Sequence, residues 1–379
     1  MKYYLIAGEA SGDLHAANLM KAIKEKDPEA NFRYFGGDEM LKQGGTLVKH
    51  YRDMAYMGFM EVIKHLPTIL SLMKQCKADI KSFSPDVVIL VDYPSFNLKV
   101  AKYVKLQLGL PVHYYIAPKL WAWKEYRIKE LKAYVDKVWS ILPFEPDYFA
   151  KFNYKVEYVG NPTVDELVRK KEAGIDCEAF KSSNSLSQKP IIALLAGSRR
   201  AEVRDNLNIM LEAIKDFDQY QAVIAGAPGL DREYYDEVIG DYKNVSIVFG
   251  QTHELLLASN LATVTSGTAT LEAAVMGVPQ VVCYRLGGGK FFYKLMEKVL
   301  KIKYVSLVNL IVDKEVVKEL LGYKLTSDSL KIELQKIILD PIEYDKIEKG
   351  YGEMMTRLGG IGAADKAASC IVDTLQKKA

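Results

Sequence analysis

The fold class is decided by the first stretch of the sequence, MKYYLIAGEASGDLHAANLMKAI (residues 1–23). An apolar run from Tyr3 to Ala7 enters a glycine-containing turn, and a helical pattern leaves it. A strand, a turn and a helix in this order are typical of an α/β protein, where the helix N-terminus at such a turn often binds phosphate. This turn instead carries two acids, Glu9 and Asp13. Because acids repel phosphate, we expect the turn to bind hydroxyl groups or an amine.

The composition indicates a globular chain of two domains. The 379 residues are 49% hydrophobic and 26% charged, and the formal net charge is only +3, so nucleic acid is not expected as a partner. The four cysteines are scattered without paired spacing, which predicts reduced thiols in a cytoplasmic protein. We identify no signal peptide and no apolar run of about 18 residues, so any membrane binding is expected to be peripheral. The oligomeric state stays open.

Apolar runs typical of buried parallel strands recur in both halves of the chain. They occupy residues 2–7, 86–92, 111–117, 136–142, 191–197, 220–226, 245–250, 261–267 and 279–285. The pattern predicts two doubly wound, Rossmann-like α/β domains that face a cleft, residues 1–165 and 185–355, joined by a polar stretch at 161–189. Because ligands bind at the carboxyl ends of parallel strands, we expect the chemistry in the loops that follow these runs.

The second half carries an anion-binding pattern after its first strand. In LLAGSRRAEV, Gly197 is followed by Ser198, Arg199 and Arg200, where the strand pattern gives way to a helical one. N-terminal helix amides, a hydroxyl and a guanidinium fork suit a phosphate group. The alternative is a solvated basic loop.

A second loop of the same kind, SGTATLE, begins at Ser266. Gly267 permits close approach of a ligand to the backbone, and the hydroxyls of Ser266 and Thr268 can donate to phosphate oxygens. Glu272 lies one helical turn beyond Thr268, where a carboxylate can accept both hydroxyls of a ribose. Together the two loops predict a site for a nucleoside diphosphate. The alternative is a capped helix in which Glu272 forms a salt bridge.

The first half is expected to supply the general base. In VVILVDYPSFN, Asp92 directly follows a strong strand, where a carboxylate can take the proton of an attacking hydroxyl. A turn-forming aspartate is the alternative. Glu9 is the second catalytic candidate, because it precedes the first helix without an evident capping role. Ser11 and Asp13 either contact the same substrate or cap the helix.

Six motifs stand in a recognisable order along the chain. They are GEASGD (8–13), D-x-P-x-F-N (92–97), Y-x-x-P-x-x-W-A-W (115–123), GSR (197–199), SGTATLE (266–272) and YVSL-x-N (304–309). In this order they resemble the lipid-A-disaccharide synthase family of Gram-negative bacteria. The resemblance covers nearly the whole chain and implies a two-domain glycosyltransferase of GT-B architecture.

The family's reaction would join UDP-2,3-diacylglucosamine to 2,3-diacylglucosamine 1-phosphate. The product would be the β-1,6-linked lipid A disaccharide, formed with inversion as UDP leaves. The resemblance implies Asp92 as general base, Glu9 and Arg199 as active-site residues and Asn309 beside the nucleotide. It also places side chains of the first domain on the acceptor side of the cleft. These are Ser11, Asp13, Trp121, Trp123 and Arg127.

The resemblance also implies that the C-terminal helix, within 356–379, returns to complete the first domain. No metal or other cofactor is expected, because cationic loops can stabilise the leaving diphosphate. The chain departs from the family pattern at positions that we expect to affect finer acceptor and acyl-chain preferences. These are Ser95, Ala117, Lys119, Asn161, Ala196, Val308 and Gly322.

An amphipathic segment in the first half is the candidate membrane contact. Its apolar residues recur at helical spacing beside several lysines, and Pro67 is expected to break or kink the helix near its middle. Such a stripe is often ordinary core, but acylated substrates favour a place in the bilayer interface. The proposed contacts are Phe59, Val62, Ile63, Leu66, Ile69, Leu70 and Met73. A second basic and aromatic stretch spans 290–305.

Two other functions compete with the transferase. A UDP-N-acetylglucosamine 2-epimerase could use the same scaffold and would need no second substrate. A non-catalytic, nucleotide-binding membrane adaptor would need neither Asp92 nor Glu9.

Overall fold

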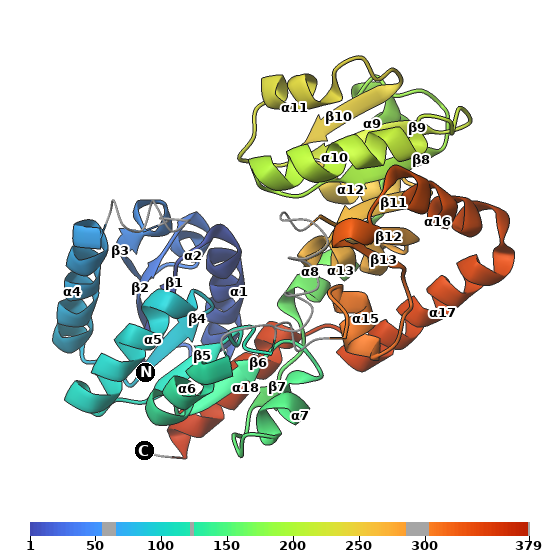
Figure 1. Cartoon of the computed structure of the whole chain (residues 1–379). Coiled ribbons are helices and arrows are strands. Elements are labelled where there is room, and N and C mark those ends of the chain that lie inside the picture. Colours follow the sequence, from blue (N-terminus) through green and yellow to red (C-terminus); the bar gives the residue numbers. More distant parts are fainter. Residues whose placement is uncertain (55–65, 122–124, 286–302, 378–379) are drawn as a thin grey trace. The chain divides into compact units, whose positions relative to one another are not determined.

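A computed structural model describes residues 1–54, 66–121, 125–285 and 303–377. The chain divides into two compact units (Figure 1). Unit 1 consists of Met1–Thr163 and Ile361–Ala379, and unit 2 of Val164–Gly360. Both are α/β units with a parallel sheet, as the apolar runs predict.

Unit 1 contains a seven-stranded sheet whose pairings are all parallel. The spatial order is β3-β2-β1-β4-β5-β6-β7. The strands are β1 (Lys2–Ala7), β2 (Asn31–Gly36), β3 (Thr46–His50), β4 (Val87–Val91), β5 (Val112–Tyr115), β6 (Lys137–Ser140) and β7 (Glu157–Tyr158).

Helices cover both faces of this sheet, because alternate strand residues point to opposite sides. Tyr4 and Ile6 pack with residues of α4 and α5, whereas Tyr3 and Leu5 pack with residues of α1. This is why the strands have continuous rather than alternating apolar sequences. The helices are α1 (Ala10–Lys26), α2 (Asp38–Lys42), α4 (Leu66–Phe83), α5 (Pro94–Tyr103), a π-helical turn η2 (Val104–Leu108), α6 (Ile128–Tyr134) and α7 (Glu145–Ala150), with 3-10 turns η1 (Tyr51–Asp53) and η3 (Glu125–Arg127).

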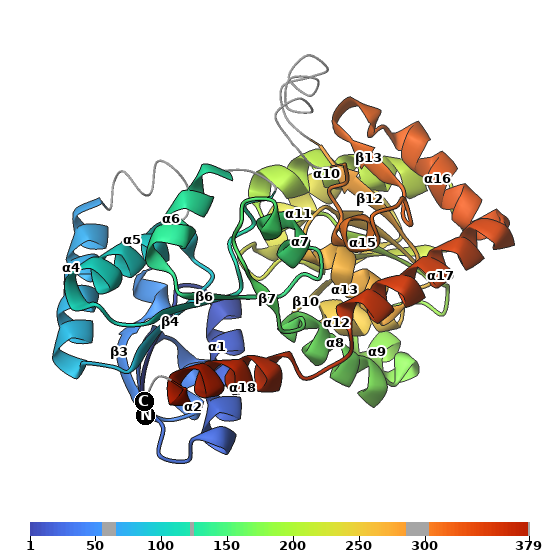
Figure 2. The ribbon, with the colours of Figure 1, turned by 90° about the horizontal axis from the view of Figure 1, so that it is seen from below.

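The C-terminal helix α18 (Ala363–Gln376) belongs to unit 1. Its buried residues Ala367, Ala368 and Ile371 share one core cluster with Ala16 and Leu19 of α1. Figure 2 shows α18 in red beside α1. The last helix therefore completes the layer on this face of the sheet.

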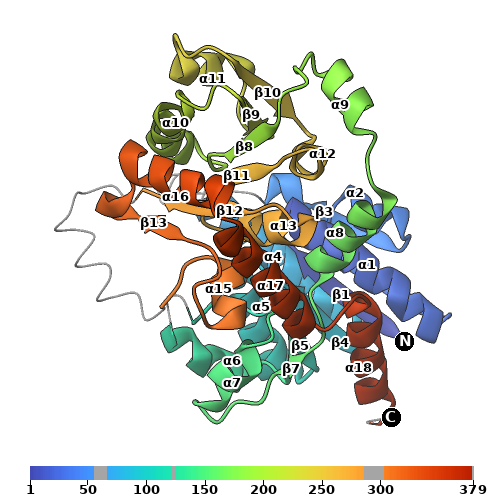
Figure 3. The same cartoon turned by 90° about the vertical axis from the view of Figure 1, so that its right-hand side faces the viewer.

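Unit 2 contains a six-stranded parallel sheet in the order β10-β9-β8-β11-β12-β13. The strands are β8 (Ile191–Leu195), β9 (Gln221–Gly226), β10 (Val245–Phe249), β11 (Leu261–Thr265), β12 (Gln280–Tyr284) and β13 (Glu319–Leu321). Among its helices, α10 packs with α11 and α16, and α13 packs with α12, α15 and α17. In Figure 3, α10 and α12 lie on either side of β8. The helices are α10 (Arg200–Ile214), α11 (Arg232–Ile239), α12 (Thr252–Leu257), α13 (Thr268–Met276), α15 (Leu307–Val312), α16 (Ser327–Leu339) and α17 (Pro341–Leu358), with a 3-10 turn η4 (Gly322–Lys324).

The polar stretch 161–189, where we expect the two domains to join, contains the boundary between the units at Thr163 and Val164. It is largely helical and forms α8 (Pro162–Ala173) and α9 (Cys177–Ser183). Pro67 is the second residue of α4 as described, and the predicted break or kink there also involves residues 55–65, which lie outside the described residues. In the described part of the chain, no helix combines the length and hydropathy needed to cross a membrane.

Candidate active site and nucleotide pocket

Each sheet has one point where the strand order reverses direction, and the predicted site residues cluster at these two points. In unit 1 the reversal lies between β1 and β4, and in unit 2 between β8 and β11. Open α/β sheets bind ligands outside the carboxyl ends of the strands at such a switch point. Glu9 and Asp92 follow the first pair of strands. Ser198 and Ser266 follow the second pair.

Asp92 sits in a strained turn that two buried side chains fix in place. Asp92 and Tyr93 both adopt left-handed backbone conformations, with φ of 44° and 46°, which are costly for residues other than glycine. The Asn97 amide donates to the Asp92 carbonyl at 2.8 Å, and the Tyr114 hydroxyl donates to the same oxygen. The turn therefore holds its conformation through contacts beneath it.

The surroundings of Asp92 change the pKa of its carboxyl. The residue is half-buried, and burial raises the pKa of its carboxyl above the ordinary value. The nearby Lys119 ammonium and the Tyr93 amide act in the opposite direction on this pKa. A raised pKa makes a carboxylate a better proton acceptor. Glu9, on the neighbouring strand end, is the N-cap residue of α1, but its side chain makes no capping hydrogen bond.

The rest of the GEASGD turn has structural roles. A side chain at Gly8 would overlap the ring of Tyr93, so glycine is needed for the two strand ends to approach. Asp13 is buried and accepts the backbone N–H groups of Gly37 (2.6 Å) and Glu39 (2.9 Å) at the start of α2. The expectation that Asp13 faces a substrate is therefore wrong, because its carboxylate caps α2. Ser11 is exposed on the first turn of α1.

Two residues of the tryptophan motif region also lie at this edge of unit 1. Trp121 is buried, and its indole N–H donates to the buried Glu145 carboxylate at 3.1 Å. Since that donor is engaged and the ring is buried, the structure gives Trp121 a packing role, and its contact with the acceptor stays a prediction. Arg127 donates to the Ser95 hydroxyl at 3.3 Å, beside the Asp92 turn. Trp123 lies outside the described residues.

Unit 2 holds a cavity of about 560 Å³ at the carboxyl ends of β8, β9, β10 and β11. The residues predicted for the nucleotide supply much of its wall. Lining residues from the two predicted loops are Gly197, Ser198, Ser266, Gly267, Thr268 and Glu272. The cavity volume falls within the range typical of small-molecule sites.

A carboxylate of the protein itself already binds the first loop of this cavity. The Glu202 carboxylate accepts the Ser198 N–H at 3.1 Å and the Arg199 guanidinium at 3.0 Å. Glu202 thus occupies donors that a phosphate would use. Arg199 is not among the residues that line the cavity, and its side chain is 75% exposed. Arg200 pairs instead with Asp231 at 3.5 Å.

The second loop is held open by glycine and tied to a later segment. Gly267 has a φ of 145°, and a Cβ there would meet open space. The Ser266 hydroxyl donates to the Val305 carbonyl at 3.2 Å, so it fixes the loop. Thr268 begins α13 and is exposed. Among the predicted hydroxyl donors to phosphate, Thr268 is thus the better placed.

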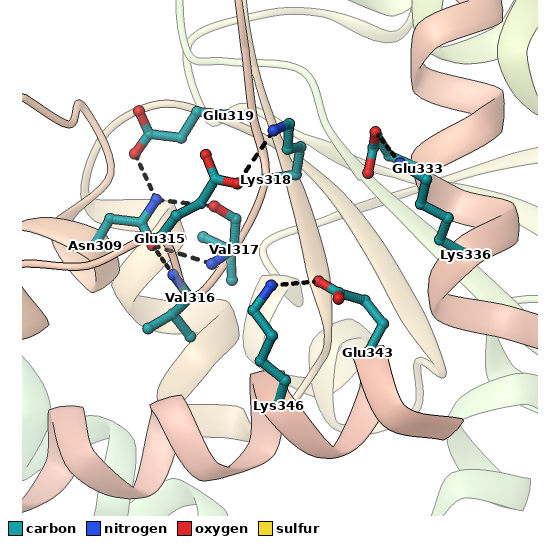
Figure 4. Close-up of polar contacts among 10 residues, drawn as sticks. All are labelled: Asn309, Glu315, Val316, Val317, Lys318, Glu319, Glu333, Lys336, Glu343 and Lys346. Atoms are coloured by element: carbon teal, nitrogen blue, oxygen red, sulfur yellow. Dashed lines mark hydrogen bonds and ion pairs between the residues drawn. The ribbon is translucent and has the colours of Figure 1, made fainter. Parts of the chain in front are cut away.

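Asn309 corrects another prediction. Its side chain is buried and bound within unit 2, as Figure 4 shows. The amide donates to the Val317 carbonyl (2.8 Å) and to Glu319 (2.9 Å), and its oxygen accepts two backbone N–H groups. Glu319 in turn accepts the N–H groups of Val305 and Ser306. Asn309 therefore does not face a nucleotide. It holds the segment that anchors Ser266.

Sequence reasoning missed three residues of the unit 2 site. His253 and Lys170 line the cavity of unit 2, from α12 and α8. A sequence signal existed for His253, which follows a strand and a glycine as the other loops do, whereas Lys170 lies in the stretch interpreted as a linker. Asn206 bridges the ends of β8 and β11, because its amide donates to Ala196 and Thr265.

The amphipathic segment is only partly described. Phe59, Val62, Ile63 and the side chain of Leu66 lie outside the described residues, as does most of 290–305. Met73 is buried in a core cluster of unit 1, so its assignment to the membrane is wrong. Leu70 is 57% exposed, and Ile69 is partly exposed.

Comparison with known proteins identifies the family. A family model described as Lipid-A-disaccharide synthetase matches residues 3–372. The chain is 37% identical to the lipid-A-disaccharide synthase of Myxococcus xanthus, over 98% of this chain and 97% of that one. The enzyme of the same name from Syntrophus aciditrophicus is 32% identical over the same shares.

Solved structures show the same fold at low identity. The UDP-GlcNAc 2-epimerase of Neisseria meningitidis, bound to UDP-GlcNAc, superposes with a TM-score of 0.70 at 16% identity, covering 100% of both chains. The calicheamicin glycosyltransferase CalG4 superposes with a TM-score of 0.62 at 14% identity, covering 99% and 98%. These likenesses concern the fold alone.

Two parallel-sheet units with these neighbours define a GT-B-type protein, the class that contains glycosyltransferases and related epimerases. Within this class the chain belongs to the lipid-A-disaccharide synthase family. It is a hexosyltransferase of lipid A disaccharide synthesis, and the epimerase and adaptor alternatives are not favoured.

Proposed function

We propose that the enzyme transfers 2,3-diacylglucosamine from its UDP-linked form to the 6-hydroxyl of 2,3-diacylglucosamine 1-phosphate. These substrates follow from the family. The observation in this chain that supports a nucleotide-linked donor is the difference between the two switch points. Unit 1 offers Glu9 and Asp92, whereas the unit 2 cavity combines the N-terminal amides of α10 and α13 with Thr268 and with Glu272, the candidate for the ribose. The donor nucleotide is accordingly assigned to unit 2 and the acceptor hydroxyl to unit 1.

The proposed reaction is a single displacement. The Asp92 carboxylate takes the proton of the 6-hydroxyl as that oxygen attacks C1 of the donor sugar. The C1–oxygen bond to the diphosphate breaks, and UDP leaves with the bonding electron pair, so the anomeric centre inverts. Arg199 and the N-terminal amides of α10 and α13 stabilise the charge that develops on the diphosphate. Glu202 must give up its place on these donors when the diphosphate binds.

We also propose that the enzyme acts as a peripheral protein at the cytoplasmic face of the inner membrane. Both substrates carry acyl chains in this assignment, and an interfacial helix would bring the enzyme to them. Leu70, exposed on α4, supports unit 1 as the part that meets the bilayer.

The reaction is tested by measuring UDP release in detergent micelles, with and without the acceptor. We expect release to require the acceptor and to fall by at least about 100-fold in Asp92→Asn, because general-base catalysis typically contributes 10²–10⁴. The matched control is Asp86→Asn, since Asp86 lies just before the same strand and accepts the Lys2 N–H at its other end. Its turnover should equal that of the wild type.

Each other outcome contradicts a different part of the proposal. A fully active Asp92→Asn would leave the reaction in place but remove Asp92 as base, and Glu9→Gln would then be the next variant. No release by folded wild type would overturn the substrates. Turnover of UDP-N-acetylglucosamine without any acceptor would show an epimerase instead.

A further inference from the structure

Four side chains of unit 2 form a continuous chain of contacts that ends in the cavity. Glu166 pairs with Lys170 at 3.0 Å, and the Lys170 ammonium lies 2.8 Å from Nδ1 of His253. Nε2 of the same histidine lies 3.3 Å from Oε2 of Glu272. These residues come from α8, α12 and α13, three helices that are separate in sequence.

The partners determine which nitrogen of His253 carries the proton. A lysine ammonium can only donate, so Nδ1 must accept from Lys170. The proton of the neutral ring is then on Nε2, where it is donated to the Glu272 carboxylate. His253 therefore passes an orienting effect from Lys170 to Glu272.

This series of contacts leaves part of the Glu272 carboxylate available to accept hydrogen bonds from a ligand. Only Oε2 is engaged by His253, and Glu272 lines the cavity with 21% of its side chain exposed. A glutamate has three rotatable side-chain bonds, so an unsupported one must be ordered when a ligand binds. One that is held beforehand binds with less entropic cost.

We propose that Lys170 and His253 are positioning residues that hold Glu272 so that it accepts the ribose hydroxyls of the bound nucleotide. The inference rests on the proposed function, because it assumes that this cavity binds a uridine nucleotide. It adds that ribose recognition depends on a histidine and a lysine that do not themselves contact the ribose.

The test compares binding of UDP with that of 2′,3′-dideoxy-UDP by isothermal titration calorimetry. Wild type should prefer UDP at least tenfold, since hydrogen bonds to a charged group are worth about that factor or more. Glu272→Gln and His253→Ala should both lose most of this preference, through weaker UDP binding and unchanged binding of the dideoxy ligand.

Conservative variants distinguish positioning from general stability. In His253→Gln the amide can accept from Lys170 and donate to Glu272, so most of the preference should return. Lys170→Met should lower the preference less than His253→Ala does, because the ring stays in place but its proton is no longer fixed on Nε2. Equal melting temperatures would confirm that all variants are folded.

Three outcomes would overturn the inference. One is equal binding of both ligands by wild type, which would leave the transferase proposal intact. Another is a His253→Ala variant that weakens both ligands equally, as a purely structural contact would. The third is an unchanged preference in His253→Ala. Failure of the wild type to bind UDP at all would instead remove the nucleotide assignment, and this inference with it.

Discussion

Each unit fixes the backbone at its switch point with a buried asparagine, but the polar groups around the two switch points differ. In unit 1, Asn97 of α5 donates from its buried side chain to the carbonyls of Val91 and Asp92. In unit 2, Asn206 of α10 donates from its buried side chain to Ala196 and Thr265. Each amide ties down the backbone where a strand ends. The residues after the strands of unit 1 include the carboxylates of Glu9 and Asp92. Those of unit 2 combine backbone amides and hydroxyls with the carboxylates of Glu202 and Glu272.

This comparison separates the scaffold from the chemistry. Asn97 satisfies two strand-end carbonyls, and Asn206 satisfies the Ala196 carbonyl and the Thr265 hydroxyl. Such buried acceptors would otherwise be costly to leave without a donor. The polar groups of the site are then supplied by only a few residues after each strand, such as Asp92 in one unit and Ser198 in the other. The opening turn of the chain has the form of a phosphate loop, but its glycine serves a close approach to Tyr93 and its Asp13 caps a neighbouring helix.

The largest expected effect comes from removing the guanidinium of Arg199 in unit 2. Arg199→Met should lower kcat/KM by about 10²–10³-fold, because a donor to the developing charge on the diphosphate is lost. The matched control is Arg204→Met on the same helix, where the guanidinium pairs with Asp205 at 3.0 Å on the surface. Steady-state kinetics of UDP release measures both. A loss in Arg204→Met as large as in Arg199→Met would contradict a specific role.

A second prediction concerns the two buried asparagines directly. Asn97→Leu and Asn206→Leu should each lower the free energy of unfolding by about 2–3 kcal/mol, because buried acceptors lose their donors. Their functional effects should differ. Asn97→Leu should lower kcat through the Asp92 turn, whereas Asn206→Leu should weaken UDP binding.

Urea unfolding, kinetics and calorimetry together measure this pair of variants. The comparison between the units fails if Asn97→Leu weakens UDP binding as much as Asn206→Leu does. It is sharpened if each variant affects only its own unit's ligand.

The sequence predicted the sheets where strands are apolar throughout and failed where they are not. β1, β4 and β8 are buried on both faces, so their composition alone identified them. β2 was missed because Arg33 interrupts its apolar run. In the structure, Arg33 forms two hydrogen bonds with Asp79 of α4, at 2.8 and 2.6 Å. That partner is distant in sequence, so local pattern could not show that a charged residue belongs to a strand.

The sequence predicted where the site residues lie better than it predicted what each residue does. Placing residues after strands brought Glu9 near Asp92 and Ser198 near Ser266, since parallel strands end at one edge. The role predicted for Asn309 is wrong, because its side-chain amide is fully engaged by backbone groups and by Glu319. Sequence motifs report that a residue matters, whereas only packing shows whether it contacts ligand or holds the loop that does.

A third prediction concerns an acid that unit 1 buries at its switch-point edge. Glu145 is buried, and burial raises the pKa of its carboxyl to about 7. A raised carboxyl pKa means that the folded state prefers the protonated form. Stability is therefore highest below the unfolded pKa near 4.3 and falls as pH rises to about 7. Glu145→Gln should remove this loss.

Urea unfolding at pH 5.5 and 8.5 measures the effect. Between these pH values, the free energy of unfolding of the wild type should fall by on the order of 2 kcal/mol more than that of Glu145→Gln. Glu130→Gln, an exposed change in the same unit, should follow the wild type. Parallel curves for wild type and Glu145→Gln would contradict a buried carboxyl with a raised pKa.

The smallest expected effect concerns which of the two units contacts the membrane. Leu70→Glu should weaken binding to vesicles of anionic phospholipid by roughly three- to tenfold, because one exposed leucine contributes about 1 kcal/mol or slightly more to interfacial burial. Two controls have similar or greater exposure. Leu106 in unit 1 is 58% exposed, and Leu339 in unit 2 is 76% exposed. Co-sedimentation should show unchanged binding for Leu106→Glu and Leu339→Glu. If Leu339→Glu weakened vesicle binding as much as Leu70→Glu does, both units would contact the membrane. The proposal that unit 1 is the part that meets the bilayer would then be wrong.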